Sequence, residues 1–334
     1  MTAWQQIDEA QARERWDGWL AQFEDAYVYQ STGWAEYKRH AGWAVLRQVI
    51  SGDDGIPRAM AQAFVKRVPV LGPMLWIPGG PVWRGVRHGE DMHALAAHLR
   101  QAARPWFVRQ FQMSRSGTAG EGPWRRPTAP NGSGASVLVD VTAPFEEWIK
   151  QIASKHRYTV RRARREPIEW RTGNDTQQLA ALAQLANELS DLKRGTGQAS
   201  SPSDLQALCA ALGSNVITLT GFLGGSPVAG CQVLRWGRTA IYATAAANQG
   251  GRDLSAAYAM IAELREVLRG AHVTEFDFGG IDPQNPAARG VDHFKLGFAG
   301  RTISYDGEWD WGSSRFTRWL GNFSIALRRR RGEW

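Results

Sequence analysis

Apolar positions at helical and strand spacing divide the second half of the chain into alternating elements. Leucines recur every three or four residues from Leu179 to Leu192 and from Leu205 to Leu212, and Gly213 follows the second stripe. Two core-facing helices are expected there. The apolar runs that follow, separated by glycine-containing turns, predict three strands, a helix and a further strand. The strands are expected at 215–223, 228–236 and 239–246, the helix at 253–269 and the last strand at 273–278.

The first half has a mixed pattern of its own. Helices are expected at 31–41 and 91–103, and strands at 44–50, 59–66 and 107–112. Between 117 and 134 the composition turns to Gly, Pro, Ser and Thr, which predicts a long surface loop at the edge of a groove. A strand at 136–141 and a helix at 144–153 are expected next, with Thr142 as the N-cap of that helix.

These elements predict an α/β (α+β) protein with two domains. The chain has 334 residues, of which 43% are hydrophobic, and this is enough for two separate cores. We expect a first domain at 1–135, a second at 136–312 and a basic amphipathic helix at 313–334.

The C-terminal segment combines an apolar helical face with a run of arginines at 328–331. Such a helix could dock on its own domain, touch tRNA or lie on the inner leaflet of a membrane, and docking is the interpretation that needs no partner. The residues of the apolar face are Phe316, Trp319, Leu320, Phe323 and Leu327.

The formal net charge of +8 predicts attraction to polyanions, such as tRNA, phosphorylated nucleotide precursors or anionic lipid headgroups. Residues 1–9 lack a signal-peptide pattern, and no apolar run reaches the length of a membrane span, so we expect a cytoplasmic protein. The two cysteines, Cys209 and Cys231, form no C-x-x-C pair and lie in apolar contexts, which is typical of reduced core residues.

One segment near the end of the second half concentrates the candidate chemistry. The run 276–282 reads FDFGGID, and the glycine pair Gly279-Gly280 is expected to end a strand. Twelve residues further on, the sequence FKLGF begins at Phe294, and Lys295 is its second residue. A single cation at the mouth of a strand is a usual arrangement for a site, so Lys295 is the leading candidate.

The FDFGG and FKLGF motifs resemble those of the Fem family of non-ribosomal peptidyl transferases, which move an amino acid from aminoacyl-tRNA to an amine of a peptidoglycan precursor. Three further matches stand in the family's order and extend the resemblance over roughly residues 28 to 310. They are Gln30-Ser31 with Trp34 and Lys38, the segment 77–82 (IPGGPV) and the segment 157–163 (RYTVRRA).

The resemblance implies two tandem acetyltransferase-like (GNAT-type) domains with an acceptor groove between them. It also implies a form without the coiled-coil arm of larger members, because no heptad-bearing insertion follows 165 or 192. The expected partners are aminoacyl-tRNA as donor and a UDP- or lipid-linked muramyl-pentapeptide, or another peptide, as acceptor. We expect no cofactor, a monomer, and transient contact with the inner membrane surface.

Roles for single residues follow from the same resemblance. Lys295 would stabilise the oxyanion of the tetrahedral intermediate or hold the terminal phosphate of the tRNA, next to Phe294 and the Gly279-Gly280 turn. Lys38, with Trp34 beside it, would contact the diphosphate of the precursor. The alternative for Lys295 is a surface lysine whose stem lies over Phe294 and Phe298, and the alternative for Lys38 is an ordinary exposed lysine of a helix.

The loop at 77–82 contains Gly79 and Gly80, which allow backbone amides to approach a ligand closely. The family usually has a tyrosine before this loop and an acidic residue after it. This chain has Trp76 before the loop and Trp83-Arg84 after it. The departure removes the basis for a tyrosine hydroxyl or carboxylate role there, and both tryptophans are equally compatible with packing.

A basic segment at 155–165 holds six Lys or Arg in eleven residues, and it also contains His156. On a helix Arg157, Arg161, Arg164 and Arg165 share one face, which could neutralise several phosphates of a precursor or tRNA. The alternative is a solvated basic helix.

Two other functions remain open. A coenzyme-A-dependent N-acyltransferase of the same fold would need a glycine-rich turn for the pyrophosphate, but 248–256 (NQGGRDLSA) lacks the alternating glycine spacing and puts an aspartate there. A non-catalytic nucleic-acid-binding protein would use the basic segment and the arginine tail.

Asp277 and Asp282 flank the glycine pair, and either could accept a proton, although a local hydrogen bond is the simpler role for Asp277. No G-x-S-x-G motif and no H-x-x-x-H spacing points to a nucleophilic triad or a metal site.

Overall fold

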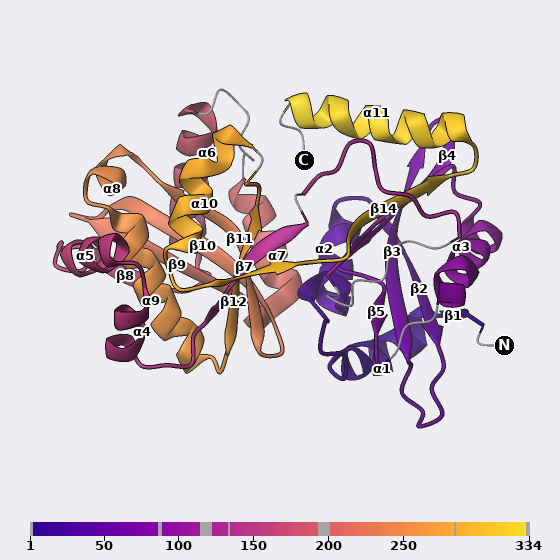
Figure 1. The fold of residues 1–334 in the computed structure, drawn as a ribbon, viewed down its shortest axis with the longest axis horizontal. Coiled ribbons are helices and arrows are strands. Elements are labelled where there is room, and N and C mark those ends of the chain that lie inside the picture. The colour runs from indigo at the N-terminus through magenta and orange to yellow at the C-terminus, as the bar shows by residue number, and fades with distance from the viewer. Residues whose placement is uncertain are drawn as a thin grey trace. The chain divides into compact units, whose positions relative to one another are not determined.

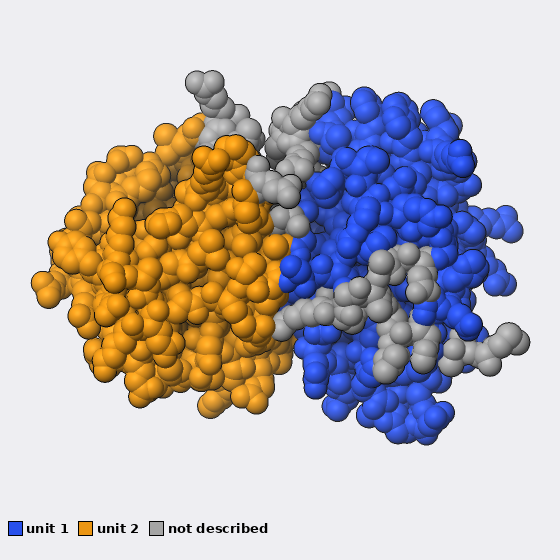
Figure 2. All heavy atoms as spheres, in the orientation of Figure 1, with its two compact units in different colours: residues 1–134, 304–329 blue, residues 135–303, 330–334 orange. Residues whose placement is uncertain are grey.

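The computed structural model of the chain describes residues 3–85, 89–113, 122–132, 134–192, 201–283 and 285–331. The chain divides into two compact units, which Figure 2 colours separately. Unit 1 comprises Met1–Gly134 and Ser304–Arg329, and unit 2 comprises Ala135–Ile303 and Arg330–Trp334. Figure 1 labels their helices and strands.

Unit 1 is built on a mixed sheet with the order β1-β2-β3-β4-β6-β14, and β5 pairs with β3. The pairing is antiparallel except between β4 and β6. The strands are β1 (Gln5–Ile7), β2 (Ala44–Ile50), β3 (Ala59–Val68), β4 (Gly72–Pro78), β5 (Val82–Trp83), β6 (Phe107–Gln112) and β14 (Gly307–Gly312), and the helices are α1 (Glu9–Leu20), η1 (Val28–Gln30), α2 (Thr32–His40), α3 (Gly89–Ala103) and α11 (Arg315–Arg331).

The predicted elements of the first half all appear within a few residues of their expected bounds. The core of unit 1 forms where α3 packs its apolar face on the sheet, with Leu95 and Leu99 fully buried against Val108 and Trp311. The second part of the predicted surface loop is anchored to this unit. There Trp124 is fully buried and donates a hydrogen bond to the backbone of Met92 at 2.9 Å.

The expected second domain at 136–312 is too long at its C-terminal end. Strand β14 pairs with β6 along its whole length, from Gly307 opposite Gln112 to Gly312 opposite Phe107. Trp309 and Trp311 of β14 are buried in the core of unit 1. Residues 304–312 therefore join unit 1 because their hydrogen bonds and their apolar side chains are both satisfied there.

Helix α11 docks on unit 1 with its polar face. Asn322 is 3% exposed and accepts a hydrogen bond from Arg109 at 2.9 Å, and Arg318 pairs with Asp310 at 2.6 Å. The docking that the sequence favoured is thus observed, but the apolar face of the helix is not the face that packs on the unit, because Phe316 and Trp319 are more than half exposed.

Unit 2 is built on a second mixed sheet with the order β13-β7-β12-β11-β10-β9-β8. Its strands are antiparallel to their neighbours where pairs are described, except that β11 and β12 are parallel. The strands are β7 (Ala135–Asp140), β8 (Glu169–Thr172), β9 (Val216–Leu223), β10 (Ser226–Trp236), β11 (Thr239–Ala247), β12 (Glu275–Ile281) and β13 (Arg301–Ser304), and the helices are α4 (Phe145–Gln151), α5 (Ser154–Ala163), α6 (Thr176–Leu192), α7 (Pro202–Leu212), η2 (Gly213–Asn215), α8 (Gln249–Asp253), α9 (Ala256–Gly270), η3 (Pro286–Ala288) and α10 (Arg289–Leu296).

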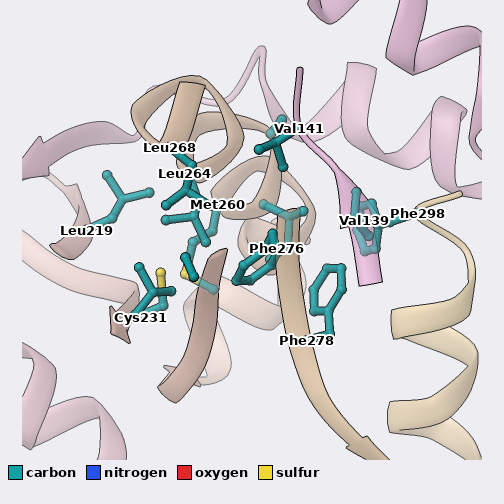
Figure 3. Close-up of a cluster of buried hydrophobic side chains, with 14 of the residues drawn as sticks. Val139, Val141, Leu219, Cys231, Met260, Leu264, Leu268, Phe276, Phe278 and Phe298 are labelled. Atoms are coloured by element: carbon teal, nitrogen blue, oxygen red, sulfur yellow. The ribbon is translucent and has the colours of Figure 1, made fainter. Parts of the chain in front are cut away.

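Helices cover both faces of this sheet. Cys231 of β10 points into the main core, where α9 contributes Met260, and Figure 3 shows Phe276, Phe278 and Phe298 gathered in that core. The next residue back, Gly230, faces the opposite side, where a Cβ would lie 3.3 Å from Leu182 of α6. Because successive residues of a strand face opposite sides of the sheet, β10 contributes residues to the core under α9 and to the core under α6.

Three local expectations for unit 2 need correction. The predicted helix at 253–269 is split, because Ser255 has a φ of +57° and separates α8 from α9. Strand β12 does not end at the glycine pair but runs on to Ile281, with a register shift between Asp277 and Gly280. The N-cap of α4 is Pro144, while Thr142 donates its hydroxyl to Asp140 at 2.6 Å.

Each sheet has one parallel pair among its described pairings, and the two pairs differ in length. In unit 1, β4 pairs with β6 at five positions and reaches Pro78, the last residue of β4. In unit 2, β11 pairs with β12 only at Thr239, Ala240 and Ile241, although β11 continues to Ala247. The two strands of unit 2 are therefore unpaired with each other over the segment of β12 that contains the glycine pair, 278–281.

Candidate functional site

Lys295 lies on α10 rather than on a strand, but its ammonium reaches the end of β12. Its Nζ donates a hydrogen bond to the carbonyl oxygen of Gly280 at 2.6 Å. Gly279 has a φ of +76°, a conformation that favours glycine, and an added Cβ would lie 4.0 Å from Nζ. The structure thus brings together Lys295, Gly279 and Gly280, and Phe294 is the neighbouring residue on the helix.

Asp277 organises the backbone of this turn. The side chain is fully buried, and its Oδ1 accepts hydrogen bonds from the amide of Gly279 at 2.8 Å and from the hydroxyl of Ser136. The local role expected for Asp277 is confirmed by these bonds. The second carboxylate of the motif, Asp282, is half-buried, and its amide donates to Asp292 at 3.1 Å.

Burial lowers the pKa of Lys295 below its ordinary value, and the nearby carboxylates of Asp292 and Asp277 oppose this shift. The ammonium is therefore less hydrated than a surface lysine, and its hydrogen-bonding is directed by the protein. A positive charge in such a place can stabilise an oxygen that becomes negative during a reaction more strongly than a charge in bulk water can.

An aromatic cluster holds α10 in position. Phe294 and Phe298 have ring centroids 5.0 Å apart, and each also contacts Tyr258 of α9. His156 of α5 is 1% exposed, and its Nε2 is 3.1 Å from the carbonyl oxygen of Phe294, so Nε2 carries the proton. A Cβ at Gly297 would overlap the His156 ring. The glycine of the FKLGF motif is thus required by the packing of α5 on α10.

The sequence did not reveal the part that His156 plays. Burial is the main cause that lowers its pKa, and its Nδ1 is buried without a hydrogen-bond partner in the described part of the chain. The only available signal was the position of His156 in the basic segment, one residue before the RYTVRRA motif. Through this residue the basic helix is joined directly to the segment that carries Lys295.

Helix α5 presents a basic pocket of about 430 Å³ with no carboxylate among its lining residues. The predicted pair Arg157 and Arg161 both line it. Arg164, which was expected on the same face, is not among the lining residues and pairs with Glu263 of α9 at 2.9 Å. The lining residues are Ser154, Arg157, Tyr158, Arg161, Arg162 and Arg165.

The turn at the N-terminal end of α9 has little capacity for a pyrophosphate. The amide of Gly251 donates to the side chain of Asn248 at 2.9 Å, and the amides of Arg252, Leu254 and Ser255 donate to carbonyls within the same turn. A Cβ at Gly251 would overlap the backbone of Val228, so this glycine serves packing. These amides are therefore not available as the cradle that coenzyme A would need.

Lys38, the candidate phosphate-binding residue of unit 1, lies among aromatic rings. The Nζ of Lys38 lies 4.9 Å from the ring centroid of Trp34, 5.1 Å from that of Tyr37 and 5.4 Å from that of Trp76. Burial lowers the pKa of Lys38 to about 8. Trp76, which stands where the family usually has a tyrosine, is thus one wall of this aromatic cage around Lys38.

The two glycines of the 77–82 loop pack against the segment before α2. A Cβ at Gly80 would lie 2.7 Å from the side chain of Gln30, which donates to the carbonyl of Pro78 at 2.7 Å. Gly79 has a φ of +67° and lies against Tyr29, which in turn contacts Trp34. The motifs at 30–38 and 77–82 are therefore neighbours in unit 1.

The tryptophan that follows the loop has a structural role. Trp83 is 9% exposed and packs edge-to-face on Trp4, with ring centroids 5.8 Å apart. Arg84 forms an exposed ion pair with Asp54. Of the two departures from the family pattern, Trp76 lies at the candidate site and Trp83 belongs to the core.

Comparison with known proteins identifies the class of this fold. Residues 154–296 match the family described as acetyltransferase (GNAT) domain. Among solved structures, FemX has a TM-score of 0.78 at 15% identity and covers 96% of this chain and 99% of its own. A tandem GNAT protein from the clavulanic acid biosynthesis pathway has a TM-score of 0.55 at 12% identity, with 94% and 99% covered.

A third similar structure is the C-terminal domain of a putative lysylphosphatidylglycerol synthetase from Agrobacterium fabrum. It has a TM-score of 0.57 at 15% identity, with 92% of this chain and 96% of that chain covered. The search of curated proteins finds no match. At these identities the likeness establishes the fold, which is a tandem GNAT fold. The resemblance to the Fem family is confirmed at this level, because FemX shares the fold over nearly the whole chain.

None of the helices within the described ranges is long and apolar enough to cross a membrane. The same residues contain no group of three or more His, Cys, Asp or Glu side chains placed to hold a metal ion.

Proposed function

We propose that this protein is an aminoacyltransferase that moves an amino acid from aminoacyl-tRNA to an amine of a peptidoglycan precursor or a similar peptide. The observation that carries the proposal is the half-buried ammonium of Lys295, which is hydrogen-bonded to Gly280 beside the unpaired stretch of β11 and β12. The FDFGG and FKLGF motifs meet at this one place in space.

The reaction needs a hydrogen-bond donor that stabilises the negative charge developing on the carbonyl oxygen of the ester. The acceptor amine attacks the carbonyl carbon of the aminoacyl ester, and a C–N bond forms as the carbonyl oxygen becomes negative. The tetrahedral intermediate then expels the ribose oxygen of the terminal adenosine, which takes up the proton lost by the amine. Lys295 would donate a hydrogen bond to the oxyanion, and the ester is already activated, so positioning supplies much of the rate.

The donor would be held by its phosphates. The basic pocket on α5 offers Arg157 and Arg161 without a competing carboxylate, and His156 connects this helix to α10. Phosphate contacts of this kind are independent of sequence and weaken with salt. The closed turn at Gly251 supports a tRNA donor over coenzyme A, because its amides already have partners within the turn.

The acceptor would meet unit 1. A diphosphate suits a compact cation with few protein hydrogen bonds, and the aromatic cage around Lys38 supplies such a cation. Charged tRNA and UDP-linked precursors are cytoplasmic substrates, so the reaction would take place there, with a monomeric enzyme.

The experiment is a transfer assay with radiolabelled amino acids on a bulk tRNA pool, offered to UDP-linked and lipid-linked muramyl-pentapeptide. The variants are Lys295→Ala and, as a matched control, Lys150→Ala, which removes an exposed lysine of α4. We expect label in a precursor with the wild type and the control, and a loss of roughly tenfold or more with Lys295→Ala.

Three results would contradict the proposal. Label transfer that is unchanged in Lys295→Ala would exclude the lysine from catalysis. Acetyl transfer from acetyl-CoA to the same acceptors, with no transfer from charged tRNA, would show a coenzyme-A-dependent N-acyltransferase instead. Tight binding of any duplex without transfer, in folded protein, would show a nucleic-acid-binding function.

A further inference from the structure

The apolar side chains of α11 form an exposed aromatic stripe. Phe316 is 64% exposed, Trp319 57%, Phe323 52% and Leu327 39%. An amphipathic helix on a soluble domain normally turns such residues toward the core. Four of the ten large apolar side chains that are exposed in the described ranges lie on this one helix, so the stripe needs a partner.

The stripe is continuous along the helix. The rings of Phe316 and Trp319 are stacked with centroids 5.9 Å apart, and those of Trp319 and Phe323 are stacked at 5.4 Å. Figure 1 shows α11 in yellow. Because the three rings contact one another, they present a single apolar surface rather than scattered side chains.

The orientation of α11 is fixed by the opposite face. A Cβ at Gly321 would lie 2.5 Å from the ring of Phe107, so the helix backbone rests directly on β6. Asn322 donates to Asp310 at 2.7 Å and accepts from the amides of Thr128 and Ala129 at 3.0 and 3.1 Å. These buried polar contacts are specific and would be lost if the helix turned its aromatic side inward.

The charge of the helix identifies the kind of partner. The segment Arg315–Arg331 contains six arginines and no aspartate or glutamate. Of these, Arg318 is paired with Asp310, while Arg315 and Arg328 are exposed. Aromatic residues flanked by exposed arginines are the composition of helices that lie in the headgroup region of an anionic bilayer.

We propose that α11 is a docking surface for an anionic lipid membrane, with the aromatic stripe inserted among the headgroups and acyl chains and the arginines on the lipid phosphates. A second copy of this chain fits less well, because it would bring two sets of arginines together without a carboxylate on either helix. The proposal does not depend on the aminoacyl-transfer function.

The test is flotation of the full-length protein with vesicles of phosphatidylcholine alone or with about one third phosphatidylglycerol. The main variant is Phe316→Gln, Trp319→Gln and Phe323→Gln together, which changes only exposed side chains. The control is Val70→Asn with Leu71→Gln, which removes two exposed apolar side chains from the turn between β3 and β4. We expect wild type and control to float with anionic vesicles, and the triple variant to bind at least about tenfold more weakly.

A second variant tests the charge separately. Arg315→Gln with Arg328→Gln is expected to lower the affinity for anionic vesicles about fivefold per arginine, and to leave the weak binding to phosphatidylcholine unchanged. Equal flotation of the wild type and the triple variant would refute the proposal. Failure of the wild type to float with either kind of vesicle would also refute the proposal. A dimer formed by the wild type and not by the triple variant would then show that the stripe binds a second copy of this chain.

Discussion

Replacing Lys38 with methionine should separate stability from function in unit 1. The lysine sits in its aromatic cage with a pKa lowered by burial to about 8. A charge that is buried at such a site lowers the free energy of unfolding of the protein. Methionine has a similar length and can fill the cage without a charge, so the substitution removes the electrostatic cost and keeps the packing.

The size of the effect follows from the pKa. A fall from 10.5 to about 8 corresponds to about 3.4 kcal/mol at 1.36 kcal/mol per pKa unit. Attraction to the rings of Trp34, Tyr37 and Trp76 and partial hydration of the half-buried ammonium reduce this figure. We therefore expect Lys38→Met to raise the free energy of unfolding at pH 7 by about 1–3 kcal/mol.

The sign can be checked against pH. Below about pH 8 the lysine is protonated in both the folded and the unfolded protein, and the cost is fully present. Between pH 8 and 10.5 the folded protein releases its proton while the unfolded chain keeps it, so the wild type gains stability as the pH rises. The stability advantage of Lys38→Met should therefore shrink across this window.

The assay is urea denaturation at pH 7 and pH 10, with isothermal titration of a UDP-linked muramyl-pentapeptide at pH 7. Lys66→Met is the control, because Lys66 also lies over a tryptophan ring, that of Trp43, but is exposed. The control should change stability by less than about 0.5 kcal/mol. We reason that Lys38 is kept for binding although it lowers stability. A free energy of unfolding that falls by more than 1 kcal/mol in Lys38→Met would refute this reasoning, and so would an unchanged affinity of that variant for the precursor.

Three further outcomes are expected. Gly297→Ala should lower the free energy of unfolding by about 2–3 kcal/mol in urea, because its methyl overlaps the ring of His156. Gly290→Ala, inside the helix α10 that Gly297 follows, meets no neighbouring atom within 4 Å and should be neutral or stabilising by up to about 1 kcal/mol. Because the pKa of buried His156 is lowered, the unfolded chain takes up a proton first as the pH falls below about 6.5; the wild type should lose stability from pH 7 to 5 more steeply than His156→Gln, as measured by thermal unfolding. Asn322→Ala removes hydrogen bonds to buried Arg109 and to two backbone amides and should cost about 2–4 kcal/mol in chemical denaturation; a cost below 0.5 kcal/mol would show that α11 is held by other contacts.

Periodicity was sufficient to predict most of the helices and strands, because each buries one regular face. It failed where the backbone is shaped by tertiary contacts. Ser255 adopts a left-handed conformation between α8 and α9, and nothing in a helical pattern of alanines and leucines marks that break. The assignment of β14 failed for a different reason, since pairing between β6 and a strand nearly 200 residues away leaves no local signal.

The candidate site residues were predicted mainly where motifs could be compared with a family. Lys38 was proposed in this way, and the family comparison gave a role to Lys295, which the lone cation after the FDFGGID run had already indicated. The cage around Lys38 could not be foreseen, because Trp76 reaches it from β4 while Trp34 and Tyr37 come from α2. Rings from two distant segments form one site only after the sheet has brought those segments together.

Helix α11 shows the limit of arguing from amphipathicity. The sequence identifies an apolar face and an arginine-rich end, but the face that docks is decided by Gly321 and Asn322, which a hydrophobic pattern counts as neutral or polar. Gly321 allows close approach to β6, and Asn322 satisfies the buried guanidinium of Arg109, which would otherwise be left without that partner. A specific polar contact thus prevails over nonspecific burial of the aromatic stripe, and the apolar surface stays available for a partner outside the chain.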